Sequence, residues 1–257
     1  MSASCTISVG AVCVALATAA SAQTAGTSVP ASLPTAEPGG AVQPVMDREI
    51  YAHVLFNELE GRLNGGNTEF RWDGQGWVGS DYDKLWIKSE GTLQGNGTLE
   101  DGQQQFLFSR AITTYFDLQG GLRSDLDSHP SRNWAAFGIQ GLAPYFFELE
   151  FTGFVSGDGH LAAKLEGSYD LLITQRLILQ PQIEVNLYSK ADPARAVGAG
   201  LSDIDTGLRL RYEFDRKFAP YIGVVYEGKF GPTASLARQA GESNGEVRFV
   251  FGVRVWF

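Results

Sequence analysis

Cysteine is nearly absent from this chain of 257 residues. The two that occur, Cys5 and Cys13, both lie close to the N-terminus. If that segment is removed after export, the rest of the chain can form neither a disulfide nor a cysteine metal site. Charged residues are also scarce, at 19%, and the net charge is −9. Nucleic-acid binding needs a basic surface that displaces counterions, so this balance argues against a nucleic-acid partner.

Long apolar runs are missing from the chain after residue 25. A membrane helix needs roughly 20 apolar residues in succession, so a helical membrane protein is not expected. The chain has instead 31 glycines and 12% aromatic residues. This composition favours strands and tight turns over helices.

The N-terminal segment has the pattern of a secretory signal. An apolar run over 6–22 ends in Ala20-Ser21-Ala22, an A-x-A cleavage site. We predict a signal peptide over 1–22 and a flexible periplasmic linker over 23–45, which is rich in Ala, Thr, Ser, Gly and Pro. No Lys or Arg precedes the run, so the α-amino group supplies the n-region charge or translation starts elsewhere. An uncleaved anchor and a lipoprotein are the alternatives.

Residues 46–257 form one predicted domain in which apolar residues recur with a period of two. In the last segment Val247, Phe249, Phe251, Val253, Val255 and Phe257 alternate with a face that carries the charges. Such a strand separates an apolar from a polar environment. The same pattern predicts twelve strands, over 50–63, 68–79, 83–94, 103–110, 112–125, 132–142, 145–155, 160–172, 177–189, 203–214, 218–230 and 246–257.

Tight turns and long loops alternate between these strands. The longest predicted loops are 95–102, 190–202 and 231–245, and the connections on the other side are short. An even strand number, strands long enough to cross a bilayer at a tilt, and short turns at one end are typical of bacterial outer-membrane barrels. We therefore predict an all-β fold, a transmembrane antiparallel β-barrel of about 12 strands with closed up-and-down topology and periplasmic termini.

A secreted β-sandwich is the alternative fold. Its outer face would be rich in Lys, Thr and Ser, whereas the polar face here carries opposite charges such as Lys88 with Glu90. The aromatic residues gather at the short-turn ends of the strands, where an interfacial girdle is expected. This predicted girdle comprises Tyr145, Phe146, Phe147, Tyr212, Phe214, Phe218, Tyr221, Trp256 and Phe257.

Charges of both signs fall on the face that points into the predicted barrel. They form either a structural network of ion pairs or a path or site for a cation. The inward set is Glu58, Glu60, Arg62, Asp73, Lys88, Glu90, Asp117, Arg123, Asp125, Glu148, Glu150, Lys164, Glu166, Asp170, Glu184, Arg209, Arg211, Glu213 and Arg254. No Ser/His pair interrupts an outward-facing row, so an enzyme is not expected.

Six segments resemble the copper resistance protein B family, and the resemblance extends over about 50–257. They are FRWDGQGWVGSDYDKLWIKSEG (70–91), YFDLQGGLRSD (115–125), GLAPYFFELE (141–150), YDLLITQRLILQPQIE (169–184), GLRLRYEFDRKFAPYIGV (207–224) and VFGVRVWF (250–257). The resemblance implies an outer-membrane protein that binds copper ions and contributes to copper homeostasis or resistance. It also implies contact with outer-membrane lipid and with periplasmic copper-handling proteins.

The predicted linker departs from the family pattern. Many members have an N-terminal segment dense in Met and His, donors that suit cuprous and cupric ions, whereas 23–45 contains neither. Met46, Asp47 and His53 then offer one sulfur, one oxygen and one nitrogen donor close together, and Asp81 and Asp83 are further candidates. The alternative is that His53 is an ordinary rim residue. A small-solute or ion channel without metal specificity, and a structural barrel that acts through its long loops, are the competing functions.

Overall fold

The computed structural model describes residues 49–65, 67–126, 132–192, 195–241 and 243–257. The predicted signal peptide (1–22) and linker (23–45) lie outside this part of the chain. No helix within the described residues is long and apolar enough to cross a membrane.

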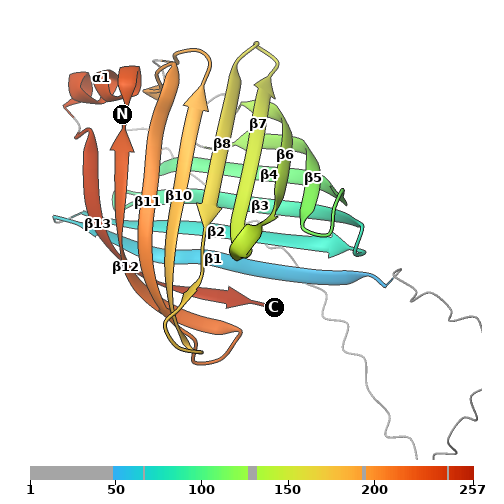
Figure 1. Ribbon diagram of the computed structural model, residues 1–257. Coiled ribbons are helices and arrows are strands. Elements are labelled where there is room, and N and C mark those ends of the chain that lie inside the picture. The colour runs from blue at the N-terminus through green and yellow to red at the C-terminus, as the bar shows by residue number, and fades with distance from the viewer. Residues whose placement is uncertain (1–48, 66, 127–131, 193–194, 242) are drawn as a thin grey trace, which may run out of the picture. The chain divides into compact units, whose positions relative to one another are not determined.

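One antiparallel sheet contains all the strands of the described residues (Figure 1). The strands are β1 (Tyr51–Asn64), β2 (Asn67–Gly79), β3 (Asp83–Gln94), β4 (Leu99–Ala111), β5 (Phe116–Asp125), β6 (Asn133–Ala143), β7 (Phe147–Ser156), β8 (Leu161–Ser168), β9 (Leu171–Leu172), β10 (Leu177–Tyr188), β11 (Gly200–Tyr212), β12 (Phe218–Lys229) and β13 (Gly245–Trp256). A 3-10 turn, η1 (Pro144–Phe146), precedes β7, and one helix, α1 (Gly231–Ala240), lies between β12 and β13.

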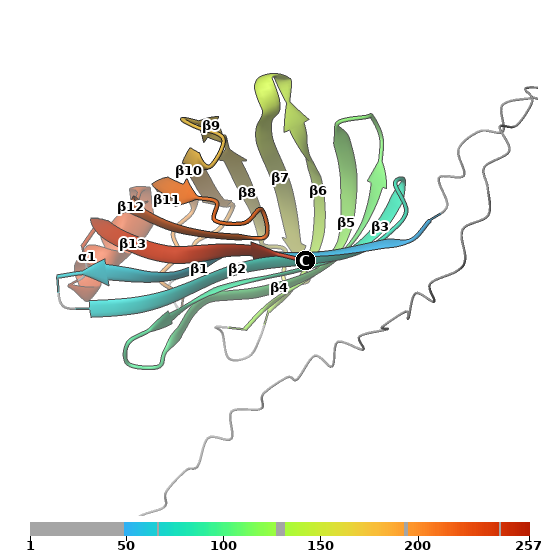
Figure 2. The same ribbon diagram turned by 90° about the horizontal axis from the view of Figure 1, so that it is seen from below.

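The sheet closes on itself because its first and last strands pair. β1 pairs with β13 from Leu55–Trp256 to Leu63–Phe249. β8 and β9 both pair with β10 and together count as one strand of the barrel. The thirteen segments therefore make a barrel of twelve strands. Viewed from below, β1–β4 form one wall and β6–β8 the opposite wall (Figure 2). The prediction of a closed barrel of about 12 strands is confirmed.

The two faces of the wall have opposite chemistry. Outward side chains are apolar and exposed, as for Leu208 at 48% and Phe249 at 67%. Many inward side chains of the predicted charged set are buried although they are ionic, as for Glu60 at 0% and Arg209 at 3%. The alternation therefore predicted correctly which face carries the charges. Burial of these charges is possible because most of them have an opposite partner, as Arg209 has in Glu58 and Glu60.

Three details differ from the sequence prediction. β4 begins at Leu99, so the predicted loop over 95–102 is shorter and its second half belongs to the sheet. The predicted loop over 231–245 contains α1. Two members of the predicted girdle, Tyr221 and Trp256, face the lumen: Tyr221 is buried, and Trp256 pairs in register with the buried Leu55. Alternation within β12 and β13 decides this orientation, and aromatic character alone does not.

The helix α1 has clear local causes. Pro232 lies in its first turn, where a missing backbone N–H costs nothing. Gly241 ends it in the left-handed conformation (φ 82°) and donates its N–H to the carbonyls of Ala237 and Arg238. The side chain of Thr233 anchors the helix to the wall, because its Oγ1 lies 3.1 Å from Ser202 Oγ and accepts the Gly198 N–H at 2.9 Å. In Figure 1 the helix lies at the end of β13 opposite the C-terminus.

A bulge in β1 changes which side chains point inward. The register with β2 shifts between Phe56, opposite Gly74, and Glu58, opposite Asp73. Beyond the bulge the inward positions of β1 are even-numbered, and before it they are odd-numbered, since one extra residue reverses the alternation. His53 and Leu55 therefore point into the barrel. In the sequence the only sign of this reversal is the polar pair Asn57-Glu58, across which the apolar positions change from Val54 and Phe56 to Leu59 and Leu63.

Candidate functional site in the lumen

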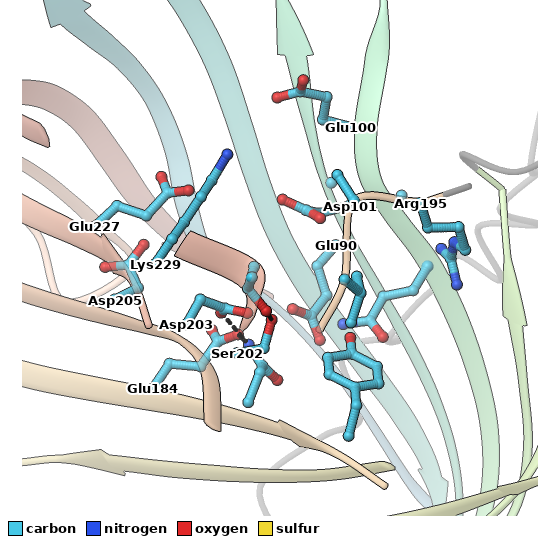
Figure 3. Close-up of a pocket in the computed structure, with 18 of the residues that line it drawn as sticks. Glu90, Glu100, Asp101, Glu184, Arg195, Ser202, Asp203, Asp205, Glu227 and Lys229 are labelled. Atoms are coloured by element: carbon cyan, nitrogen blue, oxygen red, sulfur yellow. Dashed lines mark hydrogen bonds between the residues drawn. The ribbon is translucent and has the colours of Figure 1, made fainter. Parts of the chain in front are cut away.

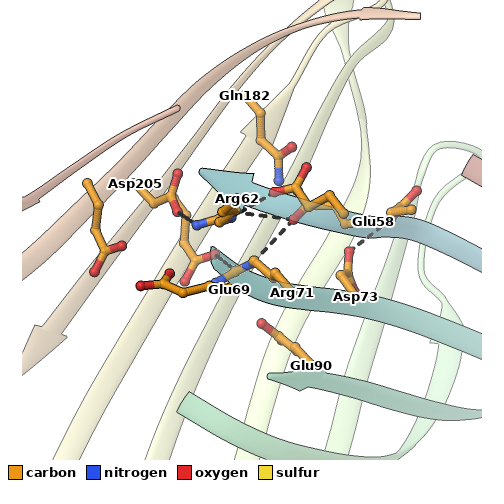
Figure 4. Close-up of polar contacts among 12 residues, drawn as sticks. Glu58, Arg62, Glu69, Arg71, Asp73, Glu90, Gln182 and Asp205 are labelled. Carbon is orange, nitrogen blue, oxygen red and sulfur yellow. Dashed lines mark hydrogen bonds and ion pairs between the residues drawn. The ribbon is translucent and has the colours of Figure 1, made fainter. Parts of the chain in front are cut away.

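Ion pairs cross the middle of the lumen and join strands that are not neighbours in the sheet (Figure 4). Arg209 on β11 reaches Glu58 and Glu60 on β1, with Nη2 2.8 Å and 3.0 Å from their Oε1 atoms. Arg71 on β2 lies 3.4 Å from Glu184 on β10. These contacts link β11 to β1 and β2 to β10. We call this belt of crossed ion pairs the waist.

A lysine holds three carboxylates together beside the waist. Glu90, Glu166 and Glu184 bring their oxygen atoms within 4.8 Å of one another, a spacing that suits a metal ion. The Nζ of Lys164 lies 2.6, 2.5 and 3.5 Å from these carboxylates. Its ammonium group therefore supplies the positive charge that a bound cation would otherwise supply. This cluster is part of the ion-pair network rather than an open metal site.

Apolar side chains occupy the lumen on one side. Leu107, Trp134, Ala136 and Phe154 form a buried cluster on β4, β6 and β7. The guanidinium of Arg123 lies 4.6 Å from the Phe154 ring centroid, so this cluster joins the charged network through a cation–π contact. The alternation predicted inward charges and did not predict this apolar wall, which narrows the lumen further.

A cavity of about 570 Å³ opens on the long-loop side of the waist (Figure 3). Seven carboxylates and four basic side chains line it, so acidic groups are in excess. The carboxylates are Glu90, Glu100, Asp101, Glu184, Asp203, Asp205 and Glu227, and the basic residues are Arg71, Arg123, Arg195 and Lys229. Figure 3 shows them projecting from two walls, with Glu227, Asp205 and Asp203 on one side and Glu100 and Asp101 on the other. We call this the acidic cavity.

Part of the negative charge in the acidic cavity is not neutralised. Neither Glu100 nor Asp101 has an ion pair or a side-chain hydrogen bond within the described part of the chain. Asp203 accepts a hydrogen bond from Asn186 Nδ2 at 2.8 Å. Gln103, also buried in this wall, has a side-chain oxygen without a hydrogen-bond partner. These oxygens suit a hard or borderline cation.

The structure describes three of the five predicted metal donors, His53, Asp81 and Asp83. Met46 and Asp47 lie outside the described residues. His53 lies on β1 and, because of the bulge, faces the lumen at the short-turn end. Asp81 and Asp83 lie at the exposed β2–β3 turn, where Asp83 is 3.8 Å from Arg110. His53 thus points into the lumen at its short-turn end.

Indole rings flank the imidazole of His53 on both sides. Its ring centroid is 6.1 Å from Trp77 on β2 and 5.5 Å from Trp256 on β13. Trp86 on β3 continues the row, 6.2 Å from Trp77. We call these four residues the aromatic mouth. The ring nitrogens of His53 have no hydrogen-bond partner among the residues that the structure describes, so both are available to a ligand.

Sequence reasoning missed the two indoles that flank His53. Trp77 shares the inward face of its strand with Asp73 and Gln75, so the alternation could have identified it. Its proximity to His53 depends on the bulge and on the register of β1 with β2, and that of Trp256 depends on the pairing of β1 with β13. The acidic cavity was missed for a different reason: the sequence pattern predicts a loop over 95–102, whereas Glu100 and Asp101 belong to β4.

Comparisons with known proteins agree with this architecture. Residues 50–257 match the family described as copper resistance protein B precursor. The chain belongs to the copper resistance protein B family. It is 46% identical over 213 residues to copper resistance protein B of Escherichia coli, covering 83% of this chain and 72% of the relative. The copper resistance protein B homolog of Pseudomonas syringae pv. tomato is 41% identical over the same shares.

The fold is also found in a solved structure. The NanC porin matches with a TM-score of 0.50 at 14% identity, over 80% of this chain and 99% of the porin. At this identity the match concerns the fold alone. A closed barrel of this kind, in a member of this family, is an outer-membrane protein.

Proposed function

We propose that this protein binds copper ions in the bacterial outer membrane and contributes to copper homeostasis or resistance. Membership of the copper resistance protein B family carries the proposal. Copper is the cargo here, and the proposal includes no enzymatic step. Outer-membrane lipid and periplasmic copper-handling proteins are the partners that the proposal implies.

The described lumen contains a donor that fits copper. Imidazole is a good copper ligand, whereas carboxylates alone prefer harder cations. His53 presents its imidazole to the lumen with both nitrogens free of described partners. Met46 and Asp47, seven and six positions earlier in the sequence, complete the proposed donor set with a thioether and a carboxylate.

The acidic cavity, at the opposite end of the barrel from His53, supports the proposal that the protein binds copper ions. Its unpaired carboxylates lower the electrostatic potential at the long-loop side, which raises the local concentration of any cation. Copper ions would collect there before they meet the waist. A cation therefore has polar ligands at one end of the lumen and an imidazole at the other.

The first test is metal content. The full-length protein is purified in detergent with copper, and bound copper is measured after removal of free ions for the wild type and for His53→Gln and Met46→Leu. We expect a loss of bound copper in both variants. A matched control is Asn57→Gln, which changes a polar residue on the same strand. Copper content that is zero in the wild type would contradict the proposal.

The second test is a growth experiment. A strain that lacks this gene and any redundant copper exporters is grown over a copper series and over a zinc series. A change in tolerance that is specific to copper, and that His53→Gln fails to restore, agrees with the proposal. Identical growth of the deletion strain and its parent across the copper series would contradict it.

A channel for small ions without metal specificity is the second candidate. The acidic cavity favours it, because a charged vestibule of about 570 Å³ leads toward the waist. The crossed ion pairs of the waist count against free passage of larger solutes. Conductance in planar bilayers that is cation-selective but independent of copper would favour this candidate over a copper-specific role.

A further inference from the structure

The aromatic mouth combines features that point to one class of ion. It contains three of the five tryptophans of the chain and a histidine with free ring nitrogens. The arrangement is built into the sheet register: His53 lies opposite Trp77, and Trp77 lies opposite Trp86. Barrel closure adds Trp256 from the other side. The imidazole is therefore held between two indoles that come from different hairpins.

The indole faces at this mouth already attract positive charge. The Nζ of Lys84 lies 5.6 Å from the centroid of Trp77, and that of Lys217 lies 5.5 Å from the centroid of Trp256. A cation over an indole is stabilised by the quadrupole of the ring, and the effect grows when water is excluded. The Lys217 side chain is long and flexible, so it can leave the Trp256 ring face to a metal ion bound at His53, whereas Lys84 is also paired with Asp117 at 3.1 Å.

The orientation of one indole is fixed independently of any ligand. The Trp256 Nε1–H donates to the backbone carbonyl of Arg216 at 2.6 Å. This hydrogen bond holds the plane of the ring beside His53. Trp86, by contrast, has a buried indole N–H without a hydrogen-bond partner. The aromatic mouth is thus partly preorganised for an ion and contains an unused polar group.

The contacts of the imidazole favour a soft monovalent cation. Within the described residues, His53 has ring contacts with two indoles and no hydrogen bond or ion pair with a carboxylate. A cupric ion prefers a tetragonal set of nitrogen and oxygen donors, which these neighbours do not offer. A cuprous ion has a single charge and is stabilised by soft, polarisable groups. Such surroundings are what two indole faces supply.

We infer that His53, Trp77 and Trp256 form a binding site selective for soft monovalent cations, cuprous or silver ion, at the short-turn mouth of the barrel. The imidazole is the ligand, and the two indoles are positioning residues that shield the ion from water and stabilise its charge. The inference rests on the proposed function, because it specifies the oxidation state of the copper and two residues that the copper would require.

The test uses the full-length protein in detergent and silver nitrate in chloride-free buffer as a redox-inert probe. Tryptophan emission and bound silver are measured together. We expect one silver ion to quench the emission of the wild type, and His53→Gln to abolish this response. Trp77→Phe and Trp256→Phe each should bind silver roughly 3- to 30-fold more weakly, the range of one desolvated cation–π contact.

Trp72→Phe is the matched control, because Trp72 lies on the same strand as Trp77 but on the alternate face, where its Nε1 donates to Ser89 Oγ at 3.2 Å. It should bind silver as the wild type does. Equal affinity for silver in wild type, Trp77→Phe and Trp256→Phe would overturn the inference. If copper still binds in that case, the proposed function stands without it. If neither copper nor silver binds the wild type, both fail.

Discussion

The two ends of the lumen differ in chemistry although both are lined by inward-facing residues of the same sheet. The long-loop end has an excess of carboxylates and oxygen donors without partners, as at Glu100 and Asp101. The short-turn end has an imidazole between indoles. The first environment suits hydrated or hard cations, and the second suits a soft cation that has lost its water.

The waist separates these two environments. It is the part of the lumen in which nearly every charge has a partner, so it contributes to the structure more than to ligand binding. The difference shows that the same alternation of strand residues can build three environments along one axis. What distinguishes them is whether the inward charges are paired, unpaired or replaced by aromatic rings.

The largest expected effect tests the waist. Arg209→Ala leaves Glu58 and Glu60 buried without their partner, which should reduce the free energy of unfolding by about 3–5 kcal/mol. Arg110→Ala is the control, because its ion pair with Asp83 is long and exposed and contributes about 0–1 kcal/mol. Denaturant unfolding from lipid vesicles measures both. Similar values for the two variants would show that the waist does not support the barrel.

A second prediction compares the lumen with the lipid-facing wall. Leu208→Arg places a charge on the outer face and should cost about 2–4 kcal/mol near the bilayer midplane. Asn186→Arg places the same side chain in the acidic cavity, between Glu184 and Asp203, and should be tolerated. Unfolding in vesicles distinguishes them. Equal destabilisation would mean that the inward and outward faces are wrongly assigned.

The smallest effect on stability is expected in the acidic cavity. The double variant Glu100→Gln/Asp101→Asn removes carboxylates without partners, so unfolding should change by less than about 0.5 kcal/mol. Binding of Mn²⁺, a hard probe, should weaken roughly 3- to 10-fold because two charges are lost. Titration by electron paramagnetic resonance measures this.

The control for this prediction is Asp81→Asn/Asp83→Asn at the opposite end of the barrel, which should leave Mn²⁺ binding unchanged. If both double variants weaken Mn²⁺ binding equally, the ion is attracted by net charge rather than by the acidic cavity. The contrast between the two ends of the lumen would then lose its basis.

Sequence alone determined the barrel and the charged lumen, because both follow from a period of two. Each residue between strand ends points inward or outward according to its parity, so Leu208 and Glu60 could be assigned without coordinates. The even number of strands and the alternation of short and long connections then indicated closure. Family membership was also accessible, since it depends on long motifs rather than on geometry.

Tertiary structure decided which of these residues meet. The bulge between Phe56 and Glu58 reverses the parity of β1 and turns His53 inward, and in the sequence only the adjacent polar residues Asn57 and Glu58 mark the place. Barrel closure brings Trp256 to His53 across about 200 residues of sequence. Contacts between distant strands depend on register and stagger, which are properties of the whole sheet rather than of any one segment.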